Sequence, residues 1–159
     1  MIAIGSDHGG FELKNEIKKH LESRGFEVKD FGAYTKDSVD YPDIAEAVCK
    51  PVANGEFEFG VLVCGTGIGI SIAANKIDGI RAALCADVYS AAMCRRHNNA
   101  NILCLGGRVT GPELAFMIVD TYLREEFEGD RHQRRIDKIT ALETIIASNS
   151  ANWVLTSQA

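Results

Sequence analysis

The stretch Val61–Lys76, VLVCGTGIGISIAANK, decides the fold that the sequence predicts. It begins as a short apolar run, which is typical of a strand buried on both faces. Glycines then follow at positions 65, 67 and 69, and a helical pattern comes after them. Such a turn in a parallel sheet lies at the carboxyl end of a strand, where ligands collect. We therefore expect a candidate site at Cys64 and the glycine loop behind it.

The whole chain alternates short apolar runs with longer amphipathic ones. This pattern indicates βαβ units and predicts an α/β fold, a Rossmann-like three-layer αβα sandwich with a five-stranded parallel sheet. The expected strands are Ile2–Gly5, Phe26–Asp30, Phe59–Cys64, Ile80–Cys85 and Asn101–Leu105. The expected helices are one that ends near 23–25, one that begins near 40–43, and others at about 69–76, 87–97, 111–126 and from 130 through 146.

Two helices carry specific expectations about individual side chains. One stripe of the first helix should face the sheet, because it repeats every four residues: Leu13, Ile17 and Leu21. The polar side chains of this helix should face solvent, namely Lys14, Lys18, Lys19 and His20. In the last helix, Asp130 and Gln133 have the spacing of a capping box.

The length of 159 residues suits one domain. We assign residues 1–147 to that domain, including its C-terminal helix, and residues 148–159 to an extension. The extension is polar apart from Trp153–Leu155, and it is either loose or packed on a second subunit. Hydrophobic residues at 46% and charged residues at 25% are ordinary for a globular protein.

Charge and hydropathy exclude several function classes. The net charge is −5, and acidic and basic residues are mixed along the chain, so nothing indicates nucleic-acid or anionic-membrane binding. The N-terminus lacks the pattern of a secretion signal. The most apolar segment, 59–74, contains four glycines and is shorter than the roughly 20 residues of a spanning helix. We expect neither export nor membrane insertion.

The five cysteines form no CxxC pair, and their odd number leaves one unpaired under any disulfide scheme. Reduced thiols in the cytoplasm fit this better. Four of the cysteines are expected to be small core residues: Cys49, Cys85, Cys94 and Cys104. Cys64 differs, because the amides of the loop and the helix N-terminus would favour its thiolate and make it a base or nucleophile.

The glycine loop has competing interpretations. It could be a tight strand-to-helix turn with no ligand, or it could bind an anion through its N–H groups. A dinucleotide-dependent oxidoreductase or a nucleotide-binding module would use the same kind of loop, and Asp87 lies where a ribose-binding acid is expected. The third position of that fingerprint is Ile70 or Ile72 rather than glycine. The dinucleotide fingerprint is therefore broken.

Further polar clusters lie at residues 6–10, 95–99 and 131–135, and we expect the first two to join the glycine loop at the carboxyl ends of the strands. These residues also have interpretations without a ligand: Asp7 could cap a helix, and His8 could be an ordinary loop histidine. His97 could belong to a polar helix end. Arg131 and Arg135 share a helix face that would suit a phosphate. The alternative for the arginines is surface pairing with Glu125, Glu126 and Glu128.

Together these motifs resemble the type B ribose-5-phosphate isomerases, in the family that also includes the galactose-6-phosphate isomerase subunits. The resemblance covers residues 1–146 and rests on residues 6–10 (SDHGG), 38–43 (SVDYPD), 64–76 (CGTGIGISIAANK), 79–82 (GIRA), 97–102 (HNNANI) and 129–132 (GDRH). Two features depart from the common pattern: Asp130, where many members have glycine, and the extension after Ile146.

The resemblance also implies roles for individual residues. Cys64 corresponds to the base that moves a proton between C2 and C1; members with a glutamate base carry it near position 70, where this chain has Ile70. Thr66 and His97 correspond to residues that open the sugar ring, with His97 supplied by a partner subunit. The enediolate-binding loop corresponds to Gly65, Gly67, Ile68, Gly69 and Ser71. The remaining residues correspond to substrate contacts or the pocket wall: Asp7, His8, Tyr41, Asn98, Arg108, Arg131 and Arg135.

The activity that the resemblance implies is the interconversion of ribose 5-phosphate and ribulose 5-phosphate, a step of the pentose phosphate pathway. It implies no metal and no other cofactor. It also implies a homodimer with shared active sites, sometimes paired into a tetramer. A six-carbon phosphosugar such as allose or galactose 6-phosphate is the alternative substrate.

Overall fold

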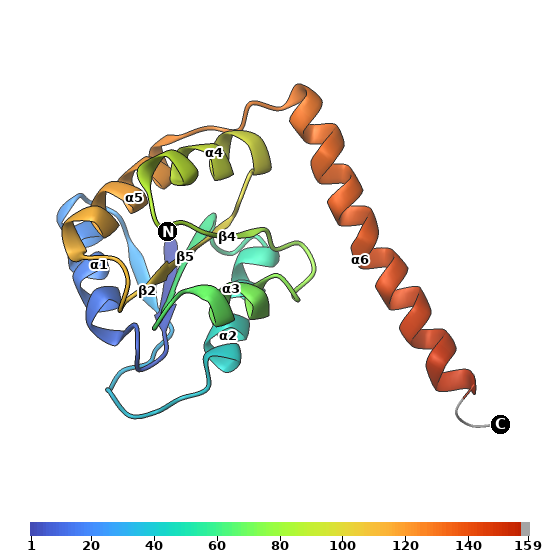
Figure 1. The fold of residues 1–159 in the computed structure, drawn as a ribbon, viewed down its shortest axis with the longest axis horizontal. Helices are drawn as coiled ribbons and strands as arrows, with labels where there is room; N and C mark the ends of the chain where they lie inside the picture. The colour runs from blue at the N-terminus through green and yellow to red at the C-terminus, as the bar shows by residue number, and fades with distance from the viewer. Residues whose placement is uncertain (157–159) are drawn as a thin grey trace. The chain divides into compact units, whose positions relative to one another are not determined.

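The computed structural model describes the backbone of residues 1–156 and the side chains of residues 1–143. It divides into two units, Met1–Phe127 and a second unit from Glu128 onward. The first unit holds the sheet and five helices, and the second holds one helix (Figure 1). None of the helices within residues 1–156 combines the length and the apolar character that crossing a bilayer requires.

The sheet has five parallel strands in the order β2-β1-β3-β5-β4, as the alternating pattern predicted. The strands are β1 (Ile2–Ser6), β2 (Val28–Asp30), β3 (Phe59–Cys64), β4 (Ala82–Leu84) and β5 (Ile102–Gly106). The three central strands are almost fully buried, which explains their continuous apolar runs. β2 and β4 are shorter than predicted, because each is an edge strand with one neighbour.

Helices cover both faces of the sheet and complete the expected three layers (Figure 1). The helices of the first unit are α1 (Phe11–Ser23), α2 (Tyr41–Ala53), α3 (Ile68–Ala74), α4 (Val88–Asn98) and α5 (Pro112–Arg124). One apolar core joins α1, α4 and α5 to one face of the sheet. A second core joins α2 and α3 to the other face.

The outer edge of β4 is paired with a side chain. Asn75, which follows α3, donates from Nδ2 to the carbonyl oxygen of Ala82 at 2.9 Å. The N–H of Ala82 donates back to Oδ1 of Asn75, also at 2.9 Å. The Asn75 amide therefore takes the place that a further strand would take beside β4.

Lys14 does not face solvent as expected. Only 1% of its surface is exposed, and its ammonium lies 2.9 Å from Oδ1 of Asp30 and 2.6 Å from the carbonyl oxygen of Ala33. The expectation was wrong because the flexible lysine side chain reaches from α1 past its apolar stripe to the end of β2. An acid supplied by another element makes this burial tolerable.

His20 is also not a simply solvated residue. Its ring stacks on Phe116 of α5 with a centroid distance of 4.4 Å, and its Nε2 lies 2.9 Å from Oδ1 of Asp120. Arg24 bonds the other oxygen of Asp120. The polar end of α1 is thus part of the contact between α1 and α5.

The second unit contains the helix α6 (Asp130–Thr156). The carbonyl oxygen of Gly129 accepts bonds from the N–H groups of His132 and Gln133. The N–H of Gln133 therefore bonds Gly129 and not the side chain of Asp130, and the Gln133 side chain donates to Asp137 at 2.7 Å, so the predicted capping box does not form. The helix continues through position 147, and the domain boundary expected there stays a prediction. The expected packing of Trp153–Leu155 lies outside the described side chains.

Candidate active site

The sulfur of Cys64 lies at the carboxyl end of β3, where the chain turns into α3. The backbone N–H of Gly67 donates to this sulfur with an N–S distance of 3.1 Å. Cys64 is 5% exposed, so the thiol lies just beneath the surface of the loop. An amide held against the sulfur offers it a partner when it carries negative charge.

Gly67 has to be glycine for two reasons. Its φ of +79° is in the left-handed region, which side chains strain to enter. A Cβ at this position would also lie 2.5 Å from Cδ1 of Leu84 and 2.9 Å from the carbonyl carbon of Leu105. Gly67 therefore lets the loop fold tightly over the ends of the neighbouring strands and brings its own N–H to Cys64.

The remaining residues of the predicted loop surround the start of α3. Thr66 is exposed, and its hydroxyl accepts a bond from the N–H of Ile68 at 3.2 Å. Ser71 donates its hydroxyl to the carbonyl oxygen of Ile68 at 2.7 Å. In any helix the N–H groups of the first turn lack intrahelical acceptors, so those of Gly69 and Ile70 are available to an oxyanion.

Tyr41 packs against this loop from the start of α2. Its ring atoms lie 2.8–3.1 Å from the position that a Cβ of Gly69 would occupy. The ring is 40% exposed, so one side faces the loop and the other is open. This arrangement suits the pocket wall that the resemblance implied.

Asp7 and His8 follow β1 and lie, like Cys64, at the carboxyl ends of the strands, as expected. The buried carboxylate of Asp7 accepts a bond from the N–H of Gly10 at 3.0 Å, so the acid does help to close the turn before α1. The exposed His8 accepts at Nδ1 a bond from the N–H of Val39 at 3.4 Å. The turn approaches β3 closely, because a Cβ on Gly10 would lie 2.4 Å from the carbonyl oxygen of Val63.

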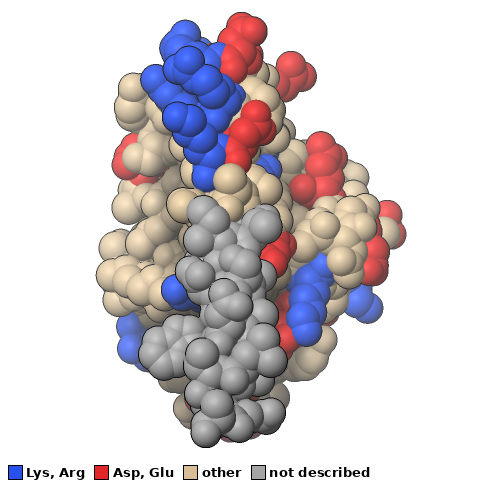
Figure 2. Space-filling model, turned by 90° about the vertical axis from the view of Figure 1, so that its right-hand side faces the viewer, with Lys and Arg blue, Asp and Glu red and all other residues tan. Residues whose placement is uncertain are grey.

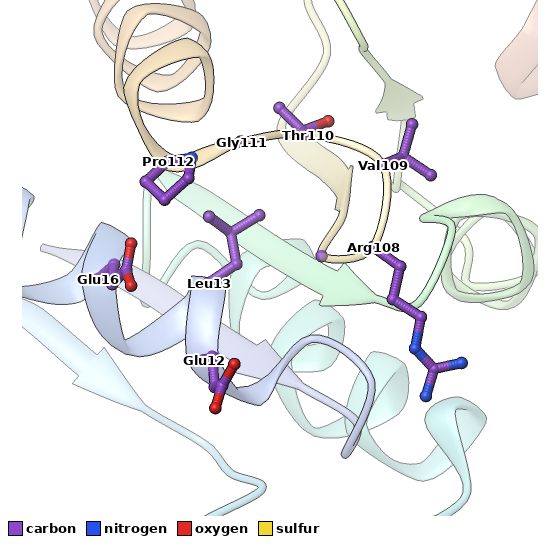
Figure 3. A pocket seen from close by; sticks show the side chains of 9 residues that line it. Glu12, Leu13, Glu16, Arg108, Val109, Thr110, Gly111 and Pro112 are labelled. Carbon is purple, nitrogen blue, oxygen red and sulfur yellow. The ribbon is translucent and has the colours of Figure 1, made fainter.

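A cavity of about 260 Å³ opens at this edge of the sheet. Its polar lining comes from His8, Glu12, Lys36 and Arg108. A neighbouring cavity of about 320 Å³ shares Glu12 and Arg108 and lies between α1 and the loop 107–112 (Figure 3). The Arg108 guanidinium extends over the glycine loop, 3.5 Å from the Cβ position of Gly65. Three basic side chains thus face one space that a phosphate could enter.

Lys36 and Glu12 are site residues that the sequence reasoning missed. They form an ion pair at the surface, and the bond from Lys36 keeps the pKa of the Glu12 carboxyl below its usual value. Lys36 lies in a loop without periodicity, so no pattern in the sequence marked it. Its place in the cavity follows only from how the loop after β2 folds back toward α1.

The comparisons with known proteins agree with this geometry. The profile of the Ribose/Galactose Isomerase family matches residues 2–139. The chain belongs to the ribose/galactose isomerase family. Ribose-5-phosphate isomerase B of Escherichia coli is 54% identical over 142 residues, which cover 89% of this chain and 95% of that protein.

Two further members of the ribose/galactose isomerase family are informative. A solved structure of ribose-5-phosphate isomerase B from Clostridium thermocellum has a TM-score of 0.90 and 55% identity, covering 91% of this chain and 98% of the other. A protein named D-erythrulose-4-phosphate isomerase from Pectobacterium atrosepticum is 45% identical over 139 residues, covering 87% of this chain and 91% of that protein. Relatives of similar identity thus carry the names of different phosphosugars.

In this isomerase-family chain, His97 and Asn98 lie near the amino ends of the strands, whereas Cys64 lies at the carboxyl end of β3. Arg81, which precedes β4, donates from Nε to the carbonyl oxygen of Asn98 at 3.0 Å. The end of α4 is therefore level with the start of the strands, whereas Cys64 pairs in register with the last residue of β5. The expectation that residues 95–99 join the glycine loop is wrong, because α4 runs back across the sheet before it ends.

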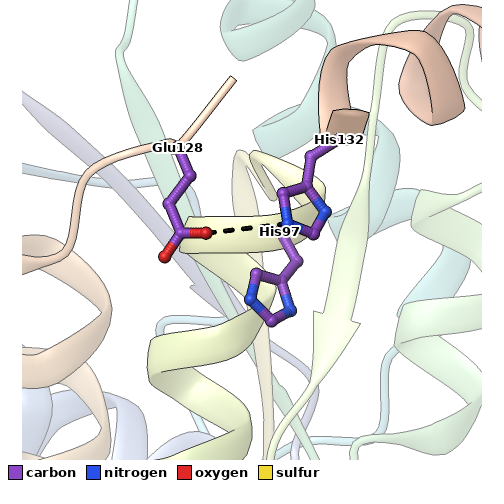
Figure 4. Close-up of side chains that lie close together, drawn as sticks. All are labelled: His97, Glu128 and His132. Atoms are coloured by element: carbon purple, nitrogen blue, oxygen red, sulfur yellow. Dashed lines mark ion pairs between the residues drawn. The ribbon is translucent and has the colours of Figure 1, made fainter. Parts of the chain in front are cut away.

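Arg131 and Arg135 belong to the second unit, where both are exposed on the first turns of α6. Figure 2 shows Lys and Arg side chains gathered where this helix begins. Two glutamates that were considered as their partners bond other residues: Glu125 accepts from Arg124, and Glu128 forms an ion pair with His132 at 3.6 Å (Figure 4). The proposed phosphate clamp stays a prediction.

Proposed function

We propose that this chain interconverts ribose 5-phosphate and ribulose 5-phosphate through an enediolate, with Cys64 as the base. The observation that carries the proposal is the Cys64 sulfur at 3.1 Å from the Gly67 amide, at the start of a helix whose preceding loop lies beneath Arg108, one of the basic residues that line the cavity. The names of the E. coli and C. thermocellum relatives, both above 50% identity, support the five-carbon substrate.

The reaction begins with a closed sugar ring. His97 donates a proton to the ring oxygen, with the hydroxyl of Thr66 assisting at the same oxygen; the bond between this oxygen and C1 breaks, and the C1 hydroxyl loses its proton to water, which gives the aldehyde. The Cys64 thiolate then removes the proton from C2 and returns it at C1, while the hydroxyl proton of O2 moves to O1. The intermediate carries negative charge on oxygen, which amides at the start of α3 stabilise by several kcal/mol when they are held in place beforehand.

Binding of the phosphate supplies the orientation. His8 and Arg108 face the cavity from two loops, and we assign them to the phosphate together with Arg131 and Arg135. Asp7, Tyr41 and Asn98 are assigned to the sugar and the pocket wall. Contacts to this remote group hold C2 against the sulfur, so binding energy is used to lower the barrier of the chemical step.

The proposal includes a homodimer whose active sites are shared, and a tetramer made of two such dimers is the alternative assembly. Its support is the separation of Cys64 and His97 within one chain. They lie at opposite ends of the strands, and the four steps from Ile102 to Gly106 at roughly 3.3 Å each correspond to about 13 Å. A side chain at one end of the strands does not reach a sugar carbon at the other end, and this separation supports the proposal that His97 comes from a second copy.

We also propose that the reaction needs neither a metal nor a cofactor, and that the enzyme works in the cytoplasm. Proton transfer next to a carbonyl involves no net redox change in the protein, and the thiol and amides supply the acid–base groups. The odd number of cysteines favours a compartment that keeps thiols reduced.

Removal of the base tests the mechanism. Cys64→Ala should lower kcat by about 10²- to 10⁴-fold, because it removes general-base catalysis while the phosphate contacts remain. KM should change little. Cys49→Ala is the matched control, since it removes another buried thiol whose pKa burial raises to about 12. Substantial turnover by Cys64→Ala would remove the sulfur as the base.

A substrate series tests the specificity. The purified chain should be assayed with ribose 5-phosphate, D-erythrulose 4-phosphate, allose 6-phosphate and galactose 6-phosphate. We expect kcat/KM to be highest for ribose 5-phosphate, by about tenfold or more, as a pocket fitted to one chain length allows. A higher value for another sugar would assign the chain to that substrate instead, and the name of the P. atrosepticum relative makes the four-carbon sugar a necessary comparison.

A further inference from the structure

The structure brings two cysteines together that the isomerase reaction does not use. The sulfur atoms of Cys85 and Cys94 lie 3.9 Å apart in the core beneath α4. Cys85 directly follows β4, and its N–H donates to the carbonyl oxygen of Cys104 at 3.2 Å. Cys94 lies on α4 and is 7% exposed, whereas Cys85 is 1% exposed. The strand end and the helix thus present their thiols to one another.

The surroundings make this pair chemically different from the other core thiols. The hydrogen bond from Cys85 lowers the pKa of Cys94 below its ordinary value, and the charge of Arg95 acts in the same direction. The same hydrogen bond, with burial, raises the pKa of Cys85. Burial raises the pKa of Cys49 to about 12, and burial together with neighbouring thiols raises that of Cys104 well above its ordinary value. One member of the pair is therefore suited to be the thiolate, and the other to be the proton donor beside it.

We propose that Cys85 and Cys94 form a reversible disulfide when the protein meets a small hydroperoxide. The sulfur of Cys94 attacks the outer peroxide oxygen, the O–O bond breaks, and the alkoxide or hydroxide leaves and is protonated. Cys94 then carries a sulfenic acid, oxidised by two electrons. The sulfur of Cys85 attacks the sulfur of Cys94, the S–O bond breaks, and hydroxide leaves as water with the proton of Cys85. Two thiols and one peroxide give a disulfide, an alcohol or water, and one further water.

The geometry requires only a small movement. The two sulfur atoms must approach from 3.9 Å to a bond length of about 2.0 Å. Cys94 can turn toward Cys85 by leaving its present bond to the carbonyl oxygen of Ala91, which is 3.2 Å long. The low exposure of both residues hinders larger thiols, which favours closure within the pair over mixed disulfides.

The disulfide would act on α4, which ends at Asn98. His97 lies less than one turn after Cys94, so a shift of Cys94 toward β4 moves the end of the helix that carries the proposed ring-opening acid. This consequence rests on the proposed function, whereas the disulfide itself does not. We expect oxidised protein to lose turnover and to regain it with dithiothreitol.

Mass spectrometry of the wild-type protein tests the disulfide directly. Trypsin cleaves after Arg81 and Arg95, so both cysteines fall in one peptide, Ala82–Arg95. After mild treatment with hydrogen peroxide and iodoacetamide, this peptide should be lighter than the unalkylated peptide by two hydrogen atoms and carry no alkyl group. Dithiothreitol before alkylation should restore two alkylated cysteines. Cys49→Ala should behave as wild type, whereas Cys85→Ala and Cys94→Ala should each prevent the product.

Three results would overturn the proposal. The first is full alkylation of both cysteines at peroxide doses that already oxidise Cys64. The second is a sulfinic or sulfonic acid on Cys94 without any intramolecular disulfide. The third is a cross-link between peptide 82–95 and the peptide with Cys104, which would assign the reactive pair differently. Because the readout is a mass, a failure of the isomerase assignment leaves this test intact.

Discussion

The ammonium of the buried Lys14 and the carboxylate of the half-buried Asp30 form an ion pair, with Nζ 2.9 Å from Oδ1 and 3.0 Å from Oδ2. Asp30 also accepts from the N–H of Gly32 at 2.9 Å, and Lys14 donates to the carbonyl oxygen of Ala33. Residues 32 and 33 in turn bond Ser6 at the end of β1. The pair therefore fixes the segment that leads from β1 into Asp7 and His8.

Lys14→Met should lower the free energy of unfolding by about 1 to 3 kcal/mol, because it removes the two bonds from Lys14 and leaves the half-buried Asp30 carboxylate with the ammonium of Lys18 at 3.8 Å as its remaining cation. Urea denaturation measures this difference. Lys19→Met, on the exposed face of the same helix, is the control and should change stability by about 0.5 kcal/mol or less. Equal effects of the two substitutions would show that the ion pair does not hold this region.

Gly67→Ala and Gly55→Ala form a matched comparison, because both glycines have a φ of +79°. The alanine at position 55 meets nothing within 4 Å, so it should cost only the backbone strain of about 1 to 2 kcal/mol. The alanine at position 67 meets Leu84 and the backbone of Leu105, so its cost should be larger by about 1 kcal/mol or more. Urea denaturation of both variants measures the difference, and similar values would contradict the close approach at Cys64.

Asp87, at the start of α4, should make a pH-dependent contribution to the free energy of unfolding. Its carboxylate accepts bonds from the N–H and hydroxyl of Ser90, both at 2.7 Å, and these bonds lower its pKa below the ordinary value of 3.8. A lowered folded-state pKa stabilises the fold above the unfolded value and loses that effect as the pH falls through the folded value. The difference in unfolding free energy between wild type and Asp87→Asn should therefore shrink below about pH 4.

Asp78→Asn serves as the control for this measurement, because Asp78 is exposed and lies between elements. The pH profile of Asp87→Asn is compared with that of this variant over the same pH range. A constant difference between wild type and Asp87→Asn would mean that the charge of Asp87 does not contribute to the helix cap.

Mixing two inactive variants tests whether the active site is shared. Cys64→Ala and His97→Ala chains that exchange freely should form mixed dimers with one intact site each. For equal amounts, the mixture should regain about a quarter of the wild-type activity, because half of the dimers are mixed and each has one working site. The measurement is turnover of ribose 5-phosphate before and after exchange. Unchanged inactivity, with exchange verified by mass spectrometry, would argue for a site within one chain.

The sequence was informative where the chemistry is local. The apolar run, the cysteine and the spaced glycines are contiguous, so the strand, the tight turn and Cys64 at the sheet edge could all be predicted. The burial of Lys14 could not, because its partner Asp30 lies sixteen residues away in a different element. Nothing in the sequence indicated the position of Lys36 either, because its partner Glu12 also lies in a different part of the chain.

The position of His97 shows a second kind of limit. Its neighbours in the sequence are polar and resemble those of the other clusters, and this similarity suggested the same edge of the sheet. The length of α4, eleven residues, carries the chain back across the sheet instead. The local sequence motif indicated His97, and only the path of the backbone showed at which end of the strands His97 lies.

The Asn75 amide at the margin of β4 limits how two copies can associate. It occupies the N–H and the C=O of Ala82 that would otherwise template a sixth strand. Association by extending the sheet from one subunit into the next is therefore blocked at this residue. A second copy therefore cannot pair its backbone with Ala82 without displacing Asn75, and the same two bonds hinder edge-to-edge growth of fibrils at this position.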